Sequence, residues 1–153
     1  MYDPALAELA LDLSRHALAQ QESSLNELRS RTGTLLAASS VATSFLGARS
    51  LDDGLGALGW LALTAFVVST AAAAYVLVPK SDLVFALRGS ILYEAELSDP
   101  GGISETSRRL AYWIESFRDD NSRVIDRLFV AFRVSAAALV LDVILWTLEL
   151  ASQ

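Results

Sequence analysis

Residues 57–78 read ALGWLALTAFVVSTAAAAYVLV, and no charged residue occurs between Asp53 and Lys80. In a helix that rises about 1.5 Å per residue, about 20 residues cross a bilayer core of roughly 30 Å. A fully buried helix of a soluble protein seldom needs an uncharged run of this length. The segment is therefore predicted to be a transmembrane helix.

A second uncharged run lies upstream, at residues 32–48 (TGTLLAASSVATSFLGA). It is shorter and rich in small residues, which lowers its hydropathy. Residues 49–56 (RSLDDGLG) separate the two runs, and their glycines and aspartates are typical of turns and helix caps. The two runs are therefore predicted to form a hairpin of two transmembrane helices.

A third apolar run follows at residues 128–148 (LFVAFRVSAAALVLDVILWTL). Arg133 lies near one end, where a long side chain can reach the lipid headgroups. Asp142 lies deeper, and a central aspartate costs roughly 2.5–3.5 kcal/mol on insertion scales. Trp146 is suited to a membrane interface. We predict a third span in which the surrounding apolar residues offset the cost of Asp142.

The composition agrees with a membrane protein. The 153 residues are 53% hydrophobic and 20% charged, against about 25% charged in ordinary soluble domains. The absence of cysteine excludes disulfides and thiolate metal sites, and the single histidine, His16, excludes multi-histidine sites. A net charge of −6 argues against nucleic acid as a partner. No cofactor is predicted.

The distribution of basic residues predicts the orientation, because Lys and Arg remain on the cytoplasmic side. Ten of them occur before residue 32 or within residues 79–127, and only Arg49 lies in the hairpin turn. With three spans, the N-terminus is predicted to lie in the cytoplasm and the C-terminus outside the inner membrane.

The parts outside the predicted spans are also expected to be helical. Asp3 and Pro4 are typical of a helix start, and no glycine or proline follows before residue 32. A cytoplasmic helix over residues 4–31 should therefore run directly into the first span. Leu11, Leu18 and Leu25 recur every seven residues, which favours either a partner helix in a second copy or packing on the same chain.

Residues 80–100 fit a short hairpin or two helical turns. The run SDPGG at residues 98–102 is a break, after which apolar residues recur every three or four positions from Leu110 to Leu128. We predict one long helix over residues 103–150, half of it cytoplasmic and half in the membrane. The predicted fold is all-α, a single membrane domain with three transmembrane helices.

The sequence contains no phosphate loop, dinucleotide fingerprint, nucleophile elbow or zinc helix. The paired carboxylates Asp52-Asp53 and Asp119-Asp120 diverge by about 100° in a helix and share no site. The chain is therefore not expected to be an enzyme.

The first predicted span carries hydroxyl residues and repeats a pattern of small residues four positions apart. Such residues allow close helix packing or line a wet pore in an assembly. Asp142 is expected to face protein or water, with the hydroxyls of this span as its partners. The candidate pore or packing residues are Thr34, Ser39, Ser40, Thr43, Ser44, Arg133 and Asp142, and the candidate self-association residues are Leu11, Leu18, Leu25, Ala38 and Ala42.

Two segments carry a resemblance to a known family. They are LNELRSRTGTLLAASS (residues 25–40), which leads into the predicted hairpin, and DDNSRVIDRLFVAF (residues 119–132), which leads into the last span. Together with the overall architecture, they resemble the transmembrane effector domain of Pycsar anti-phage systems. The resemblance implies a protein that oligomerises and breaches the inner membrane upon a cyclic-nucleotide signal. A separate cytoplasmic sensor or cyclase-linked protein would supply that signal.

Three functions remain open at this point. The first is an oligomerising effector that disrupts the inner membrane or conducts across it. The second is a membrane-anchored adaptor whose cytoplasmic helices bind a partner protein. The third is a soluble helical bundle, which dependence on detergent would exclude.

Overall fold

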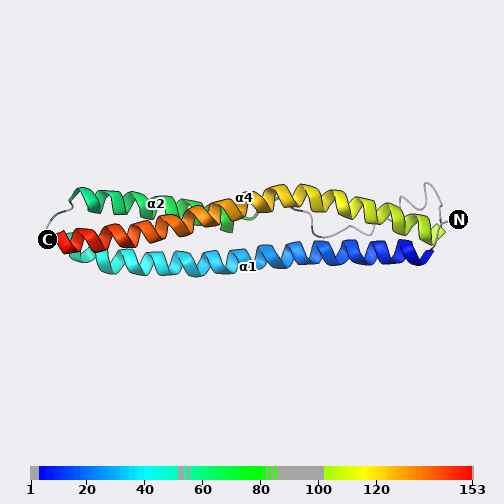
Figure 1. The fold of residues 1–153 in the computed structure, drawn as a ribbon, viewed down its shortest axis with the longest axis horizontal. Helices are drawn as coiled ribbons and strands as arrows, with labels where there is room; N and C mark the ends of the chain where they lie inside the picture. The colour runs from blue at the N-terminus through cyan, green and yellow to red at the C-terminus, as the bar shows by residue number, and fades with distance from the viewer. Residues whose placement is uncertain are drawn as a thin grey trace. The chain divides into compact units, whose positions relative to one another are not determined.

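The computed structural model describes residues 4–51, 54, 56–81, 83, 85 and 102–152. These residues form three α-helices and no strand (Figure 1): α1 (Pro4–Leu51), α2 (Ala57–Leu77) and α4 (Gly102–Ser152). The predicted all-α class is confirmed for this part of the chain.

The helix bounds follow the sequence signals closely. The predicted helix over residues 4–31 continues through residues 32–48 without a break, as α1. α2 ends one residue earlier than predicted, because Val78 is extended ahead of Pro79. α4 covers the predicted long helix with one or two extra residues at each end. Asp3 and almost all of residues 80–100 lie outside the described residues.

The turn between α1 and α2 depends on two glycines. Gly54 has φ of +87°, a conformation that other residues rarely adopt. Gly56 is the N-cap of α2, and its carbonyl accepts a hydrogen bond from the Trp60 amide at 3.2 Å. The predicted turn over residues 49–56 is correct in place, with its first three residues in the last turn of α1.

Within the part of the chain that the structure describes, two helices, not three, are long and apolar enough to cross a membrane: α2 and the apolar part of α4. Residues 32–48, the remaining predicted segment, are helical as part of α1 but are not apolar enough to meet the same criterion. The physical reason is composition. The hydroxyls of this segment and its many small side chains reduce its hydropathy below that of the other two segments.

The chain divides into two compact units. The leader unit comprises Met1–Asn26 and Lys80–Ile125, and the hairpin unit comprises Glu27–Pro79 and Asp126–Gln153. The described residues of each unit have a core of their own, in which parts of α1 and α4 pack together.

The core of the leader unit contains an apolar cluster. Leu18 of α1 packs with Leu110 and Ile114 of α4, and Leu11 and Phe85 pack against this cluster. The Gln21 side-chain amide donates to the Arg118 carbonyl at 3.0 Å. Leu11 and Leu18, which belong to the seven-residue repeat of α1, thus pack within the same chain. This is one of the two alternatives that the repeat predicts.

One face of α4 is buried at every seventh residue. The positions are 107, 114, 121, 128, 135, 142 and 149, and none is more than 8% exposed. A strict repeat of seven is the pattern of left-handed helix packing. We refer to these positions as the α4 seam.

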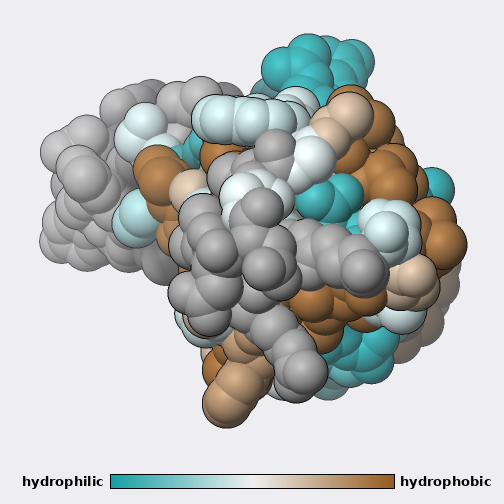
Figure 2. All heavy atoms as spheres, turned by 90° about the vertical axis from the view of Figure 1, so that its left-hand side faces the viewer, coloured by the Kyte–Doolittle hydropathy of each residue, from teal (hydrophilic) through white to brown (hydrophobic). Residues whose placement is uncertain are grey.

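The hairpin unit buries polar side chains among apolar ones, such as Val76, Leu128 and Trp146. Its buried polar residues are Thr32, Ser39, Ser69, Ser135, Asp142 and Glu149. Large exposed hydrophobic residues lie on all three of its helices, among them Phe45 of α1, Trp60 of α2 and Leu141 of α4. Figure 2 looks along the helices, and hydrophobic side chains reach the surface in this view. Buried carboxylates and hydroxyls beside exposed large apolar residues depart from the usual order of a soluble protein.

Candidate functional site: the polar interior of the hairpin unit

Asp142 lies at the centre of the candidate site. Its side chain is fully buried, and its Oδ2 accepts a hydrogen bond from Thr43 Oγ1 at 2.7 Å. α1 supplies Thr43 and α4 supplies Asp142, so the bond joins two helices. The predicted contact between Asp142 and a hydroxyl of residues 32–48 is confirmed.

The second carboxylate oxygen of Asp142 has no hydrogen bond among the described residues. Trp146 follows one turn later on α4, and its buried indole N–H lies close to the Asp142 carboxylate, although not in strict hydrogen-bond geometry. Ser39 Oγ on α1 also has no hydrogen bond among the described residues. Because buried polar atoms are nearly always bonded to protein or to water, these atoms mark places where further donors or acceptors can enter.

Gly47 allows Trp146 to approach α1 closely. A Cβ atom at Gly47 would lie 3.2 Å from Trp146 Cζ2, which is closer than ordinary van der Waals contact. The absence of a side chain at Gly47 therefore helps to fix the indole on the face of α4 that also carries Asp142.

A pair of serines joins α2 to α4. Ser69 Oγ donates to the Ser135 carbonyl and Ser135 Oγ donates to the Ser69 carbonyl, each at 2.9 Å. The two Oγ atoms are 3.2 Å apart. Each hydroxyl thus bonds the backbone of the opposite helix, and small side chains at both positions permit the close approach.

Glu149 caps the N-terminus of α2. Its carboxylate accepts hydrogen bonds from the amides of Gly56 at 2.7 Å and Gly59 at 3.2 Å. The first amides of a helix lack partners within the helix and favour a negative charge. A Cβ atom at Gly56 would lie 2.6 Å from Glu149 Oε1, so only glycine fits there without a shift.

Glu149 and the serine pair were not among the predicted site residues. The signal for Glu149 was present, because it lies seven residues after Asp142 and would occupy the same face of a long helix. Its partners at the start of α2 could not be deduced, since they are about 90 residues away in the sequence.

The five predicted hydroxyls do not share one face of α1. Ser39 and Thr43 point into the hairpin unit, whereas Thr34, Ser40 and Ser44 are exposed. Thr34 and Ser40 donate to carbonyls one turn earlier in α1. Arg133 is exposed, as is Ala38, and Ala42 is half-buried. Of the predicted self-association residues, Leu18 and Leu25 are buried within the chain and Leu11 is half-buried.

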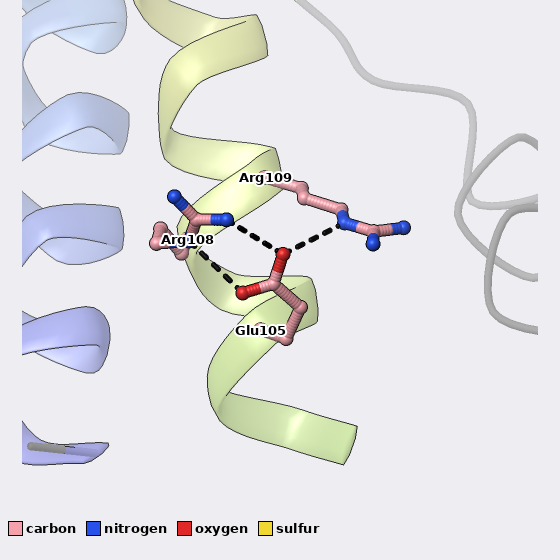
Figure 3. Close-up of polar contacts among 3 residues, drawn as sticks. All are labelled: Glu105, Arg108 and Arg109. Carbon is pink, nitrogen blue, oxygen red and sulfur yellow. Dashed lines mark hydrogen bonds and ion pairs between the residues drawn. The ribbon is translucent and has the colours of Figure 1, made fainter. Parts of the chain in front are cut away.

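A charged cluster lies in the first turns of α4, within the leader unit (Figure 3). The Glu105 carboxylate accepts two hydrogen bonds from Arg108, at 2.7 and 2.9 Å, and one from Arg109, at 3.0 Å. The hydrogen bonds from Arg108, followed by that from Arg109, lower the pKa of Glu105 from 4.5 to about 2. Its position in the first helical turn also suits a negative charge.

The described residues contain no group of three or more His, Cys, Asp or Glu side chains that could hold a metal ion. The chain matches no protein-family model, no curated protein sequence and no solved structure.

Proposed function

We propose that the hairpin unit lies in the bacterial inner membrane. The observation that supports this most strongly is the exposure of its apolar helices. In the most apolar stretch of each helix, only 28% is buried in α2 and 17% in α4. A core helix of a soluble protein is mostly buried, whereas lipid covers apolar side chains that the protein leaves exposed.

Residues 27–51 of α1 accompany α2 and α4 into the bilayer in this proposal. They belong to the same compact unit, and Thr43 bonds Asp142 within the apolar part of α4. Their outward hydroxyls at Thr34 and Ser40 are satisfied by the helix backbone, which lowers the cost of exposing them to lipid. Packing would thus hold a segment that hydropathy alone would not.

The distribution of Lys and Arg supports a cytoplasmic leader unit and an external C-terminus, as the sequence predicts. The leader unit would then meet a cytoplasmic sensor or cyclase-linked protein, as the resemblance to Pycsar effectors implies. The lipid bilayer and further copies of the chain are the other proposed partners.

We infer that the protein acts on the membrane as a self-associating effector, which disrupts the bilayer or conducts across it. The buried carboxylate of Asp142 supports this function over simple anchoring. An anchor gains nothing from such a group, which costs roughly 2.5–3.5 kcal/mol to insert at the centre of a span.

Induced expression in bacteria, with a potential-sensitive dye and a membrane-impermeant dye, tests this function. Loss of membrane potential within minutes of induction is the expected result. Cells that keep both their potential and their barrier, with the protein present in the inner membrane, would contradict the effector function.

Self-association is tested at Ala38, which is exposed on α1. Ala38→Leu adds bulk where small residues would allow two copies to approach. We expect a smaller complex in mild detergent. Ser40→Ala, also on the exposed surface of α1, is the control, and a complex of unchanged size in Ala38→Leu would place the interface elsewhere.

The adaptor function remains as an alternative because of one observation in the leader unit. Leu6, Leu9 and Leu13 are each more than half exposed, on one side of α1. Such a stripe suits a partner helix. Replacing the three leucines by serine would abolish the cellular effect if the protein is an adaptor, and would leave purified protein fully active in vesicles if it is an effector.

A further inference from the structure

We propose that Asp142 is a proton-binding site and that the hairpin unit conducts protons through its polar interior. This inference rests on the proposed function and names the ion that crosses the membrane. It follows from the isolation of the Asp142 carboxylate, from the tight contacts around it, and from the polar residues that continue along the same interior.

Among the side chains that the structure describes, no basic group bonds the Asp142 carboxylate. Residues 32–48 of α1 include no ionisable side chain, and Tyr75 is the only one in α2, where it is half exposed. On α4, Arg133 is exposed and nine residues away, and Glu149 is itself acidic. A carboxylate buried without a counter-charge is far more stable with its proton bound.

The second oxygen of Asp142 is the place where the proton exchanges. Thr43 donates to Oδ2, whereas Oδ1 is buried, and the Trp146 indole lies near the carboxylate but outside strict hydrogen-bond geometry. A water molecule at Oδ1 would complete the bonding of this atom. The protonated Asp142 would pass its proton to a water on one side and then accept another proton at Oδ1 from a water on the other side. Only O–H bonds form and break, and the protonated acid is regenerated.

Hydroxyl and carboxylate groups continue from Asp142 in both directions along the α4 seam. Ser135 lies seven residues before it and Glu149 seven residues after it, which places the groups about 10 Å apart along the helix. The serine pair and the Glu149 cap are in direct contact with their partners, at 2.7–3.2 Å. Contacts this short leave no room for a hydrated metal ion between the bonded groups. Short chains of water molecules would have to bridge the steps of about 10 Å between these groups to relay protons.

Leu128 is the one apolar residue of the α4 seam within the hairpin unit, and it is fully buried. In the proposed orientation it lies on the cytoplasmic side of Ser135. A buried leucine at this place interrupts the polar interior. We therefore assign it the role of a barrier that limits proton flow.

The test uses the purified full-length chain in vesicles of phosphatidylethanolamine and phosphatidylglycerol. A potassium gradient with valinomycin sets the membrane potential, and a trapped pH dye reports proton entry. Asp142→Asn should reduce proton flux at least tenfold, because the amide keeps the bond with Thr43 but carries no exchangeable acid proton. Asp142→Glu should retain flux and Leu128→Ser should increase it. Thr64→Ala is the matched control, because Thr64 is exposed on α2 and its hydroxyl donates to the Trp60 carbonyl one turn earlier.

The outcomes separate this inference from the function on which it rests. Proton flux without release of a trapped larger dye supports it. Release of that dye, or equal flux in Asp142→Asn with unchanged helix content, would overturn proton selectivity and leave the effector function standing. Absence of all flux from an inserted protein would contradict the effector function itself. If Asp142→Asn fails to insert, unchanged flux in Leu128→Ser would overturn the proposed path.

Discussion

Single side chains at the helix ends hold much of this structure in place. Glu149 reaches the N-terminus of α2 from α4, and Gly56 makes room for it. The Glu105 carboxylate forms ion pairs with Arg108 and Arg109 at the start of α4. Both carboxylates bind donors close to a helix N-terminus, yet the first joins two helices and the second acts within one.

Gly56→Ala should destabilise the hairpin unit. The new Cβ would lie 2.6 Å from Glu149 Oε1 and would force the carboxylate away from the amides that it caps. Loss of such buried hydrogen bonds costs about 1–3 kcal/mol of folding free energy. Thermal unfolding in detergent should show this loss as a lower midpoint temperature. Gly33→Ala is the matched control, because no atom lies within 4 Å of its Cβ position. Equal midpoints for the two variants would show that the Glu149 cap is unimportant.

Acid should loosen the first turns of α4. The pKa of Glu105 is lower in the folded chain than its ordinary value of 4.5, so its ion pairs stabilise the helix fully above about pH 4.5. That stability is lost as the pH falls toward about 2. Amide hydrogen exchange should show this loss in the parent and not in Glu105→Gln. Asp120→Asn, from an exposed pair with Arg123 at 3.9 Å, is the control; the same acid response in Glu105→Gln would refute the prediction.

At the scale of whole helices, α2 and α4 are joined by small polar residues rather than by large apolar ones. Ser69 and Ser135 bond each other's backbone. In lipid, apolar side chains gain little by leaving one neighbour for another, so close contact and hydrogen bonds hold helices together. The same logic applies to Thr43 and Asp142 between α1 and α4.

The serine pair should show coupling in a double-mutant cycle. Ser69→Ala and Ser135→Ala should each lower stability by about 0.6 kcal/mol, the average for interhelical bonds in a bilayer. The double variant should cost less than both together, because each hydroxyl also contacts the other. Unfolding in mixed micelles measures these differences. Strictly additive values, or an equal loss in Ser40→Ala, would argue against the pair as a link.

Much of the helix pattern could be predicted from the sequence, for identifiable reasons. The uncharged run of α2 is closed by Pro79 on one side and by glycines on the other, so its bounds are close to unambiguous. The inward face of α1 could also have been predicted, because the seven-residue spacing of Leu11, Leu18 and Leu25 continues to Thr32 and Ser39. That register would have placed Ser40 and Ser44 outside. The Glu149 cap and the serine pair could not be predicted from the sequence, because each joins residues that are far apart in the chain.

At the scale of the whole molecule, the proposed topology makes a direct prediction. A reporter active only outside the inner membrane should give signal when fused after Gln153, and none when fused before Met1 or at Gly101. The reason is the excess of Lys and Arg in the leader and in residues 79–127. Signal at both ends, or at neither, would require an even number of crossings and would contradict the proposal that residues 27–51 cross with α2 and α4.

The polar bonds of the hairpin unit also govern how this chain can be made. Thr43 and Asp142 are 99 residues apart, the serines 66, and Glu149 and its amides 90 or more. Every one of these bonds needs α4, which leaves the ribosome last. Until synthesis ends, Thr43, Ser69 and the amides at the start of α2 must therefore find other partners, in water, lipid or the insertion machinery. A nascent chain that stalls before Ser135 would expose all of them, and quality-control proteases would have a distinctive unfinished product to recognise.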